Sequence, residues 1–395
     1  MDSSVVTDVA NDLNAKATAY TKQRDEKSRR ELRETARKLS ASLESPVESF
    51  RQTIFQLHRS AAVRTAIEGG WFEALAGGEP QTATQLASAT GAQSSLLVRI
   101  MRVLTAEGIV EEPDVDTYAA NEKTRAYTIP GLRDGVKHFF DQCGPSLVKL
   151  PQYLANTSFR EPIDIPTGPY AFAHGMSFWK LAEERPRPRE TFNSFMTMQK
   201  EGRGNWVDLF PVEERLAPSL REDPDAVLLV DVGGGRGHDL EDFKARYGHG
   251  RLPGRLVLED LPATLADVRA LEKEGIELRE YDFFTQQPVT GARVYYFRSI
   301  LHDWPDEECR QILRNTKSAM AKGYSSILIN DIVLPDRGAP AFGACLDLSM
   351  MAVLSGKERT RKEWSALLSS VGLAIVDIWT LEEGGESIIE TVLKD

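Results

Sequence analysis

The sequence predicts an α/β fold, in which a mostly parallel sheet carries helices on both faces and ends in an antiparallel edge hairpin. A helix-rich, winged-helix-like domain is expected before it. Strand patterns and amphipathic helix patterns alternate after residue 222, which is typical of parallel sheets. Helical patterns and one short hairpin pattern occupy 1–128, and a proline-broken helical stretch fills 129–222. We therefore expect domains at 1–128, 129–222 and 223–395.

The first domain is predicted to contain helices and a two-stranded wing. One short helix spans 84–90, and Ser94 or Ser95 is expected to cap the next. That helix is predicted from apolar residues recurring at i, i+3, i+4 and i+7, namely Leu97, Ile100, Met101 and Leu104. Two short strands, 109–112 and 117–120, then flank a polar turn.

A winged helix can place its second helix in a DNA groove. Here that helix offers only Arg99 and Arg102, and the wing is acidic, with Glu111, Glu112, Asp114 and Asp116. Phosphates would be repelled. The formal net charge of -11 also argues against nucleic acid as a partner. Subunit pairing or substrate enclosure is the expected role.

Composition bounds the remaining possibilities. With 41% hydrophobic and 27% charged residues in 395, the chain is typical of a globular protein with a large core. Its three cysteines, Cys143, Cys309 and Cys345, lack disulfide or metal-ligand spacing, which indicates a reducing compartment. No apolar run reaches the length of a membrane span, and the N-terminus has no signal-peptide pattern. A cytoplasmic location without membrane partners is expected.

Six strands are predicted in the last domain, at 226–232, 255–259, 293–298, 325–334, 373–380 and 387–394. Only EEGGE at 382–386 joins the last two, which is too short for a crossover helix. These strands should therefore pair as an antiparallel hairpin. In the preceding 129–222 stretch, the aromatic residues form either plain core or a pocket wall.

The segment LLVDVGGGRG at 228–237 indicates a nucleotide-like cofactor. A buried-type strand ends at Asp231 and runs into glycines, which permit positive φ and close approach of a ligand. A dinucleotide fingerprint would need a sixth-position glycine, where His238 stands. This difference argues against a dehydrogenase.

Ligands of such sheets bind beyond the carboxyl ends of the strands. Glu259 and Asp260 follow the second strand, where a carboxylate can accept hydrogen bonds from ribose hydroxyls. Asp282 offers an acceptor for an exocyclic amine, beside the aromatic faces of Phe283 and Phe284. The strand at 293–298 brings Arg298, His302, Asp303 and Trp304 to the same edge.

The ordered motifs VDVGGGRG, LEDLP, YDFF, RSILHDW, DIVLP and GKERTRKEW resemble those of class I S-adenosylmethionine-dependent small-molecule O-methyltransferases. The similarity is to the caffeate and isoflavone type and its fungal secondary-metabolite branch, and it runs from about residue 50 onward. It implies a Rossmann-like methyltransferase sheet and a winged-helix domain that forms a homodimer. Glu259 and the YDFF segment depart from the plant pattern and concern adenine packing.

The resemblance also implies roles for individual residues. His302 matches the general base, with Asp331 and Glu358 as flanking acids. S-adenosylmethionine would be bound, without a metal, by Asp231, Gly233, Gly235, Asp260, Asp282, Phe283 and Arg298. The acceptor pocket would be walled by Phe192, Met196, Met350 and Met351.

These roles fit the chemistry of methyl transfer to a hydroxyl. Proton transfer from a phenol near pKa 10 to an ordinary histidine near 6.5 is uphill by roughly 5 kcal/mol. A carboxylate on the other ring nitrogen raises the basicity of histidine, and Asp331 or Glu358 could supply it. We therefore expect an O-methyltransferase that acts on a hydroxyl, most plausibly phenolic, of an aromatic secondary metabolite. Methylation of a carboxylate or nitrogen by the same fold, and a non-catalytic cofactor-binding dimeric scaffold, are the alternatives.

Overall fold

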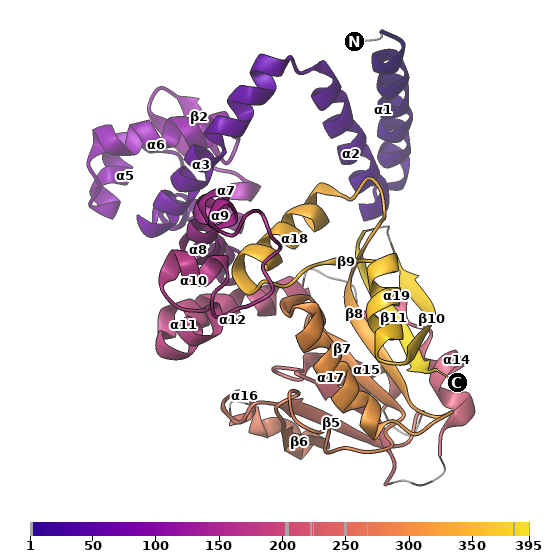
Figure 1. Ribbon diagram of the computed structural model, residues 1–395. Helices are drawn as coiled ribbons and strands as arrows, with labels where there is room; N and C mark the ends of the chain where they lie inside the picture. Colours follow the sequence, from indigo (N-terminus) through magenta and orange to yellow (C-terminus); the bar gives the residue numbers. More distant parts are fainter. Residues whose placement is uncertain are drawn as a thin grey trace. The chain divides into compact units, whose positions relative to one another are not determined.

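The computed structural model describes residues 3–201, 205–221, 223, 225–248, 251–266, 268–381 and 384–394. The chain divides into two compact units, one from Met1 to Thr128 and one from Ile129 to Asp395 (Figure 1). Residues 129–222 thus share a unit with the sheet. Within the described residues, no helix is long and apolar enough to cross a bilayer.

The first unit is mainly helical, with a small sheet of strand order β1-β3-β2. Its elements are α1 (Ser3–Gln23), α2 (Glu26–Leu43), α3 (Pro46–Glu68), α4 (Trp71–Ala76), β1 (Gln81–Thr82), α5 (Ala83–Thr90), α6 (Ser94–Ala106), β2 (Val110–Asp114), β3 (Thr117–Ala120) and α7 (Glu122–Ala126). The antiparallel pair β2 and β3 is the predicted wing.

The capping of α6 differs from the expectation. Gln93 is the N-cap residue and makes no side-chain cap hydrogen bond, and both Ser94 and Ser95 lie inside the helix. The side-chain cap of this region belongs instead to α5, where Thr82 forms a capping box with Gln85. The apolar face of α6 still buries Leu97, Met101 and Leu104, and that face, rather than a cap, positions the helix.

The second unit opens with a helical segment. Its elements are α8 (Pro130–Lys137), the π-helix η1 (His138–Cys143), α9 (Gly144–Asn156), α10 (Pro169–His174), α11 (Phe178–Glu184), α12 (Pro186–Glu201), α13 (Trp206–Leu209), α14 (Val212–Leu216) and η2 (Ala217–Ser219). Helices α9 and α10 contact α18 of the following segment, which explains why this stretch is no separate unit.

The main sheet has the order β10-β11-β8-β7-β4-β5-β6, and β9 pairs with β8 beside this path. Its strands are β4 (Val227–Val232), β5 (Arg255–Asp260), β6 (Ile276–Glu280), β7 (Val294–Arg298), β8 (Ser326–Leu334), β9 (Arg359–Thr360), β10 (Leu373–Thr380) and β11 (Glu386–Leu393). The antiparallel hairpin of β10 and β11 confirms the prediction, although Glu382 and Glu383 in its turn lie outside the described residues. Strand β6 was not predicted: it is a short edge strand whose residues are mostly only half-buried.

Helices cover both faces of this sheet (Figure 1). They are α15 (His238–Tyr247), α16 (Pro262–Ala266), η3 (Arg269–Glu274), η4 (Leu301–Asp303), α17 (Asp306–Ala319), α18 (Ala341–Leu354) and α19 (Arg361–Ser370). In β7, Tyr295 packs in one core cluster with Trp364 of α19, whereas Tyr296 packs in the other with Phe243 of α15. Successive side chains of a strand point to opposite faces, so the predicted α/β class with a covered parallel sheet is confirmed.

Candidate active site

The glycine loop joins β4 to α15. Gly233, Gly235 and Gly237 have φ of 71°, 59° and 74°, which glycine adopts without strain. The amides of Gly233 and Gly234 donate to the carbonyl oxygen of Glu259 at 2.8 and 3.2 Å. A Cβ on Gly235 would meet no atom within 4 Å. The loop therefore presents open main chain beside the ends of two parallel strands, which is the form that a close-binding cofactor needs.

Asp260 fastens the end of β5 to this loop. Its Oδ2 accepts a hydrogen bond from the amide of Gly235 at 2.9 Å, and its Oδ1 accepts one from the amide of Leu261 at 2.7 Å. Glu259 behaves differently, because its side chain is buried and accepts a hydrogen bond from Gln287 Nε2 at 2.8 Å. Burial raises the pKa of Glu259 to about 7. Of the two acids, the more exposed Asp260 is placed to meet a ligand.

Arg298 at the end of β7 is held by two carboxylates. Its Nη1 lies 2.7 Å from Asp239 Oδ1, and its Nη2 lies 3.1 Å from Glu386 Oε1. These ion pairs join α15, β7 and β11 at the edge of the glycine loop. The sequence predicted Arg298 at the cofactor but did not reveal either acidic partner, because both lie far from it in the chain.

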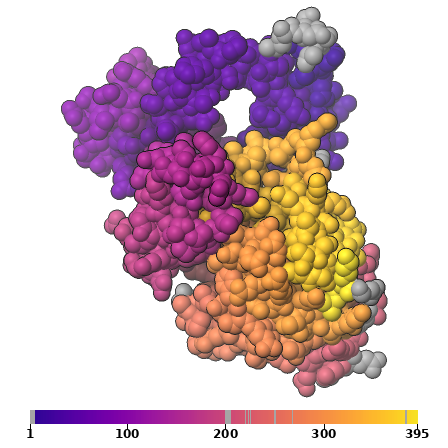
Figure 2. All heavy atoms as spheres, in the orientation of Figure 1, coloured from indigo at the N-terminus to yellow at the C-terminus, as the bar shows by residue number. Residues whose placement is uncertain are grey.

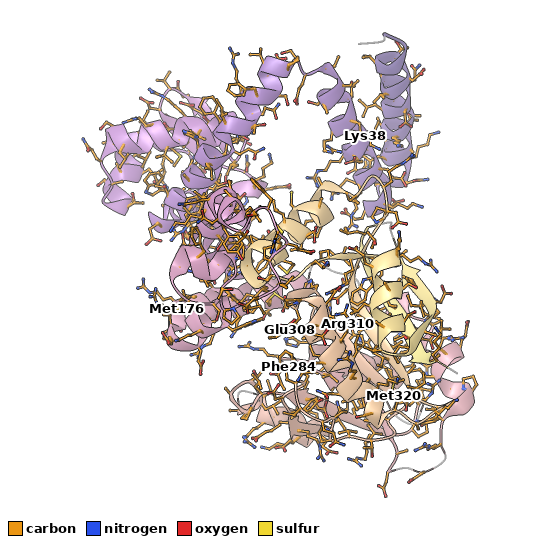
Figure 3. The ribbon with its side chains drawn as sticks, in the orientation of Figure 1. Lys38, Met176, Phe284, Glu308, Arg310 and Met320 are labelled. Atoms are coloured by element: carbon orange, nitrogen blue, oxygen red, sulfur yellow. The ribbon has the colours of Figure 1, made fainter. Side chains whose placement is uncertain are left out.

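An aromatic group lies beyond β6. The ring of Trp304 lies edge-on to Phe283 and Phe284, with centroid distances of 5.9 and 4.7 Å. Asp282 accepts a hydrogen bond from the amide of Phe284 at 3.0 Å and thereby fixes the turn. Phe283 also lies within 3.7 Å of the position that a Cβ on Gly233 would take. Phe283 thus lies beside the glycine loop, with Asp282 preceding it in the chain. Figure 3 labels Phe284, the next residue.

His302 lies in η4, between the end of β7 and α17, and only 14% of its side chain is exposed. Its Nδ1 is 2.7 Å from Glu358 Oε1, and its Nε2 is 3.4 Å from Asp303 Oδ1. Asp331 of β8 completes the acidic surroundings. Neither carboxylate oxygen of Asp331 has a hydrogen-bond partner among the described residues. The structure therefore gives Glu358, and not Asp331, the direct contact with His302.

The charges of this cluster are strongly coupled. Burial alone would lower the pKa of His302, but the surrounding carboxylates, Glu358 foremost, outweigh it and raise that pKa to about 10. Burial raises the pKa of Asp303 to about 6 and that of Asp331 to about 7. A histidine with this environment is a stronger base than the free side chain.

Arg359 and Gly356, which the sequence motifs did not indicate as site residues, hold the turn at 301–304 that carries His302. Arg359 is buried and donates to the carbonyl oxygens of Leu301 and Trp304 at 2.9 and 3.0 Å. A Cβ on Gly356 would come within 2.1 Å of the carbonyl oxygen of His302, so only glycine fits there. Both belong to the GKERTRKEW motif, from which the sequence predicted a role only for the acid Glu358.

The predicted acceptor residues lie on two helices. Phe192 of α12 and Met350 of α18 pack against one buried cluster, as do Phe139, Met176 and Trp179. Met196, on α12, is 36% exposed, and Met351, next to Met350, is half-buried. Figure 3 labels Met176, which precedes α11. Figure 2 shows the surface indented between the helices of 169–198 and the part of the sheet that carries α16 and β6.

The aromatic cluster continues to the catalytic turn. Trp179 of α11 stacks on Trp304, with ring centroids 6.3 Å apart and planes inclined by 15°. Trp304 is two residues from His302 and also contacts the aromatic residues near the glycine loop. The aromatic residues near the glycine loop, the turn that carries His302 and the predicted acceptor residues are therefore connected through Trp304.

Comparisons with known proteins agree with this geometry. A family model for an O-methyltransferase domain matches residues 154–374, and one for an O-methyltransferase dimerisation domain matches 51–129. The chain is 38% identical to methyltransferase cfoC of Aspergillus candidus, over 93% of this chain and 92% of that protein. It is 34% identical to demethylsterigmatocystin 6-O-methyltransferase of Aspergillus flavus, over 85% of each chain.

Solved structures show the same relationship. LepI in complex with SAM superposes with a TM-score of 0.88 at 29% identity, covering 98% of this chain and 99% of that chain. OxaC in complex with sinefungin and meleagrin superposes at 0.86 with 30% identity, covering 100% of both chains. These findings confirm the predicted family and the cofactor S-adenosylmethionine, and the dimerisation domain supports a homodimer. The chain belongs to the O-methyltransferase family and is an S-adenosylmethionine-dependent O-methyltransferase of fungal secondary metabolism.

Proposed function

We propose that this enzyme methylates a phenolic hydroxyl of an aromatic secondary metabolite and that His302 is the general base. The observation that carries the proposal is the 2.7 Å contact between His302 Nδ1 and the buried carboxylate of Glu358. It orients the ring, so that in the basic form Nε2, which lies 3.4 Å from Asp303 Oδ1, would be the nitrogen that takes the proton of the hydroxyl. The alternatives, a carboxylate acceptor or a non-catalytic scaffold, would not need a base of this strength.

The described residues fit the cofactor. The main chain of Gly233 and Gly235, which is open at Gly235, would hold its methionine and ribose parts together with Asp231 and Asp260 at the ends of neighbouring strands. Asp282 and Phe283 would hold the adenine, and Arg298 would support the methionine end through its acidic partners. When bound, S-adenosylmethionine supplies an electrophilic methyl group on a sulfonium centre.

His302 is matched to a phenol. An ordinary histidine would leave proton transfer uphill by roughly 5 kcal/mol, because its pKa is about 3.5 units below that of a phenol. With the pKa of His302 raised to about 10, transfer from the hydroxyl to Nε2 becomes nearly level. The imidazolium so formed is stabilised by the carboxylate of Glu358 on the other nitrogen.

Phe192, Met196, Met350 and Met351 would wall the acceptor pocket. Aromatic and thioether side chains offer apolar faces to a flat molecule. Because these residues come from α12 and α18, the helical stretch of 129–222 would contribute one side of the pocket. We further propose that residues 1–128 pair two such chains, as the dimerisation-domain match supports.

The test is transfer of labelled methyl from S-adenosylmethionine to phenols, aryl carboxylates, hydroxamates and amines, with the wild type beside His302→Ala. We expect label in phenols, loss of that activity in the variant, and unchanged affinity for S-adenosylhomocysteine by calorimetry. Equal turnover by the variant would remove the base assignment. If the label enters only carboxylates or amines, the acceptor is not a phenol and the proposed substrate class is wrong.

One comparison favours a second candidate. A structure described as a pericyclic reaction enzyme superposes with a TM-score of 0.88 at 30% identity, covering 98% of this chain and 100% of that one. The fold alone thus accommodates rearrangement of a bound molecule. Conversion of an added compound without release of S-adenosylhomocysteine would establish that candidate here.

A further inference from the structure

A second buried histidine lies in the wall of the proposed acceptor pocket. His138 opens the π-helix η1 and is 6% exposed. Its Nδ1 has no hydrogen-bond partner among the described residues, and its Nε2 lies 3.6 Å from Cys143 Sγ. Native proteins pair nearly all buried polar atoms, and π-helical turns are frequent at functional sites. The unpaired Nδ1 of His138 is therefore a candidate hydrogen-bonding group for a bound molecule.

Aromatic rings surround this imidazole. Its centroid lies 5.3 Å from that of Phe192, 5.4 Å from Phe139 and 6.0 Å from Phe195. These three phenylalanines are only partly buried, so the group of rings around His138 extends to the protein surface. Burial lowers the pKa of His138 to about 4, which keeps the ring neutral at physiological pH. His138 can therefore act as a hydrogen-bonding group but not as a cation.

Two glycines bring α12 against this site. A Cβ on Gly135 would come within 2.7 Å of Phe195 Cδ2, and a Cβ on Gly131 within 2.1 Å of Met198 Cβ. Both glycines lie on α8, directly before η1. Their lack of side chains allows α12 to approach α8 closely, and this approach places Phe192 and Phe195 over His138.

A second unpaired nitrogen belongs to the same cluster. Trp179 Nε1 is buried and has no hydrogen-bond partner within the described part of the chain. The Trp179 ring lies 6.3 Å from Phe192, which also contacts His138, and it stacks on Trp304 at 6.3 Å. The rings of His138 and Trp179 thus both contact Phe192. Trp179 in turn contacts Trp304, in the turn that carries His302.

The chemistry of these atoms defines what they would bind. Burial raises the pKa of the Cys143 thiol to about 12, so the thiol keeps its proton. Sulfur is a weak acceptor, and the favoured arrangement has the thiol donate to His138 Nε2, which leaves the ring proton on Nδ1. Tryptophan Nε1 is a donor only. Both nitrogens therefore present N–H groups, and an oxygen that only accepts hydrogen bonds complements them.

We propose that His138, assisted by Trp179, recognises a carbonyl oxygen of the acceptor and so selects aromatic hydroxyketones over phenols that lack the carbonyl. This proposal rests on the proposed function, since it places the acceptor between His302 and the aromatic cluster. His138 is a specificity-determining residue in this view, and its ring donates through Nδ1 without exchanging a proton with the reacting oxygen.

The test uses isomeric hydroxyfluorenones and the matching hydroxyfluorenes, which differ only in the ketone oxygen. Their binding to the homodimer is measured by calorimetry with S-adenosylhomocysteine present, so that no turnover is required. We expect the best-bound fluorenone to bind the wild type about 3- to 10-fold more tightly than its fluorene, the range of one net hydrogen bond. His138→Phe should abolish this preference while keeping an aromatic ring.

His138→Asn supplies the matched rescue, because its amide can place an N–H near the position of Nδ1, and it should restore part of the preference. Thermal unfolding of each variant identifies loss of the fold. A purely structural role for His138 would weaken both ligands equally, and that result would overturn the proposal. Equal binding of ketone and hydrocarbon by the wild type, or no binding of either, would also overturn it. Failure of His302→Ala to affect methylation would instead remove the base assignment and leave the ketone preference measurable.

Discussion

His302 Nδ1 lies 2.7 Å from Glu358 Oε1, although the two residues are 56 positions apart in the chain. The side chain of Glu358 is fully buried, so solvent does not screen this pair. The carboxylate therefore acts on the histidine at nearly full strength. In the proposed mechanism, this contact sets the strength of His302 as a base and the pH dependence of the rate.

Replacing Glu358 by glutamine should reduce kcat/KM for a phenol. The amide keeps the size of the side chain but removes the charge that raises the pKa of His302. We expect a loss of about 10²- to 10⁴-fold, the usual contribution of general base catalysis. Steady-state kinetics checks this, and affinity for S-adenosylhomocysteine should stay the same. Glu363→Gln is the control, because glutamine can also serve the capping box that Glu363 forms with Thr360. Equal rates for both variants would contradict the role of Glu358.

The pH dependence follows from the sign of the shift at His302. Its pKa is raised to about 10, so the imidazolium predominates at neutral pH and the basic form increases as pH rises. Below that pKa, kcat/KM should climb by about tenfold per pH unit. In Glu358→Gln the rising part of the kcat/KM profile should move to lower pH, because the pKa of His302 falls. The pKa of the phenol itself is unchanged by this substitution. A profile that is flat from about pH 6 to 9 would disagree with a histidine base.

The same shift predicts a contribution to stability. A histidine with a raised folded-state pKa stabilises the fold fully below its unfolded pKa of about 6.5, and this contribution is lost as pH rises through about 10. The wild type should therefore lose more unfolding free energy between neutral and alkaline pH than His302→Gln does. Urea unfolding at several pH values measures the difference. Parallel curves for the two proteins would mean that the folded-state pKa is near the ordinary value.

Arg359→Lys should lower both the free energy of unfolding and the rate of methyl transfer. The guanidinium donates to two carbonyl oxygens of the turn and pairs with Asp306, and a lysine ammonium cannot match that planar set of donors. We expect a cost of about 2 to 4 kcal/mol in unfolding free energy, because buried carbonyls lose their donors. Urea denaturation measures this loss. The exposed Arg361→Lys, two residues on, should change stability by less than about 0.5 kcal/mol. A matching small effect at Arg359 would refute its role in holding the turn.

Asp260→Ala should weaken binding of S-adenosylhomocysteine by about 1.5 to 3 kcal/mol, the scale of a lost charged hydrogen bond. The alanine also releases the amide of Gly235, which Asp260 holds at 2.9 Å, so part of the loss comes from a loosened loop. Calorimetry gives the affinity. Glu280→Ala, an exposed acid at the end of β6, serves as the matched control and should leave it unchanged. Unchanged affinity in Asp260→Ala would show that the cofactor does not contact this strand end.

The sequence predicted those parts of the fold that are encoded by local patterns of residues. Alternating strands and helices, the glycine loop and the terminal hairpin all follow from local patterns, and the structure confirms them. Strand β6 was not predicted because it lacks a clear apolar pattern. Its residues, IELRE, are mostly polar, and it pairs with β5 at the edge of the sheet. Ser94 and Ser95 carry a local capping signal, which the packing of the apolar face of α6 overrides.

A candidate site residue could be predicted where it comes after a predicted strand. Asp260 and His302 come after the strands predicted at 255–259 and 293–298, whereas Asp282 was singled out although the strand before it, β6, was not predicted. Arg359 and His138 were not predicted, because their importance arises from contacts with carbonyl oxygens and rings that are distant in sequence. The choice between Asp331 and Glu358 as the direct partner of His302 likewise required three-dimensional distances.

The amide of Lys357 donates to the carbonyl oxygen of His302 at 3.0 Å, and Gly356 leaves room for that oxygen. The rings around His138 come instead from α11, α12 and the π-helix. The spacing of His302 and Glu358 is thus set by backbone contacts among loops of the sheet, and the shape of the proposed acceptor wall by side chains on separate helices. If the proposed roles hold, substitutions in α12 should change which acceptors are methylated without moving His302, because 298–304 and 356–359 are held by their own contacts.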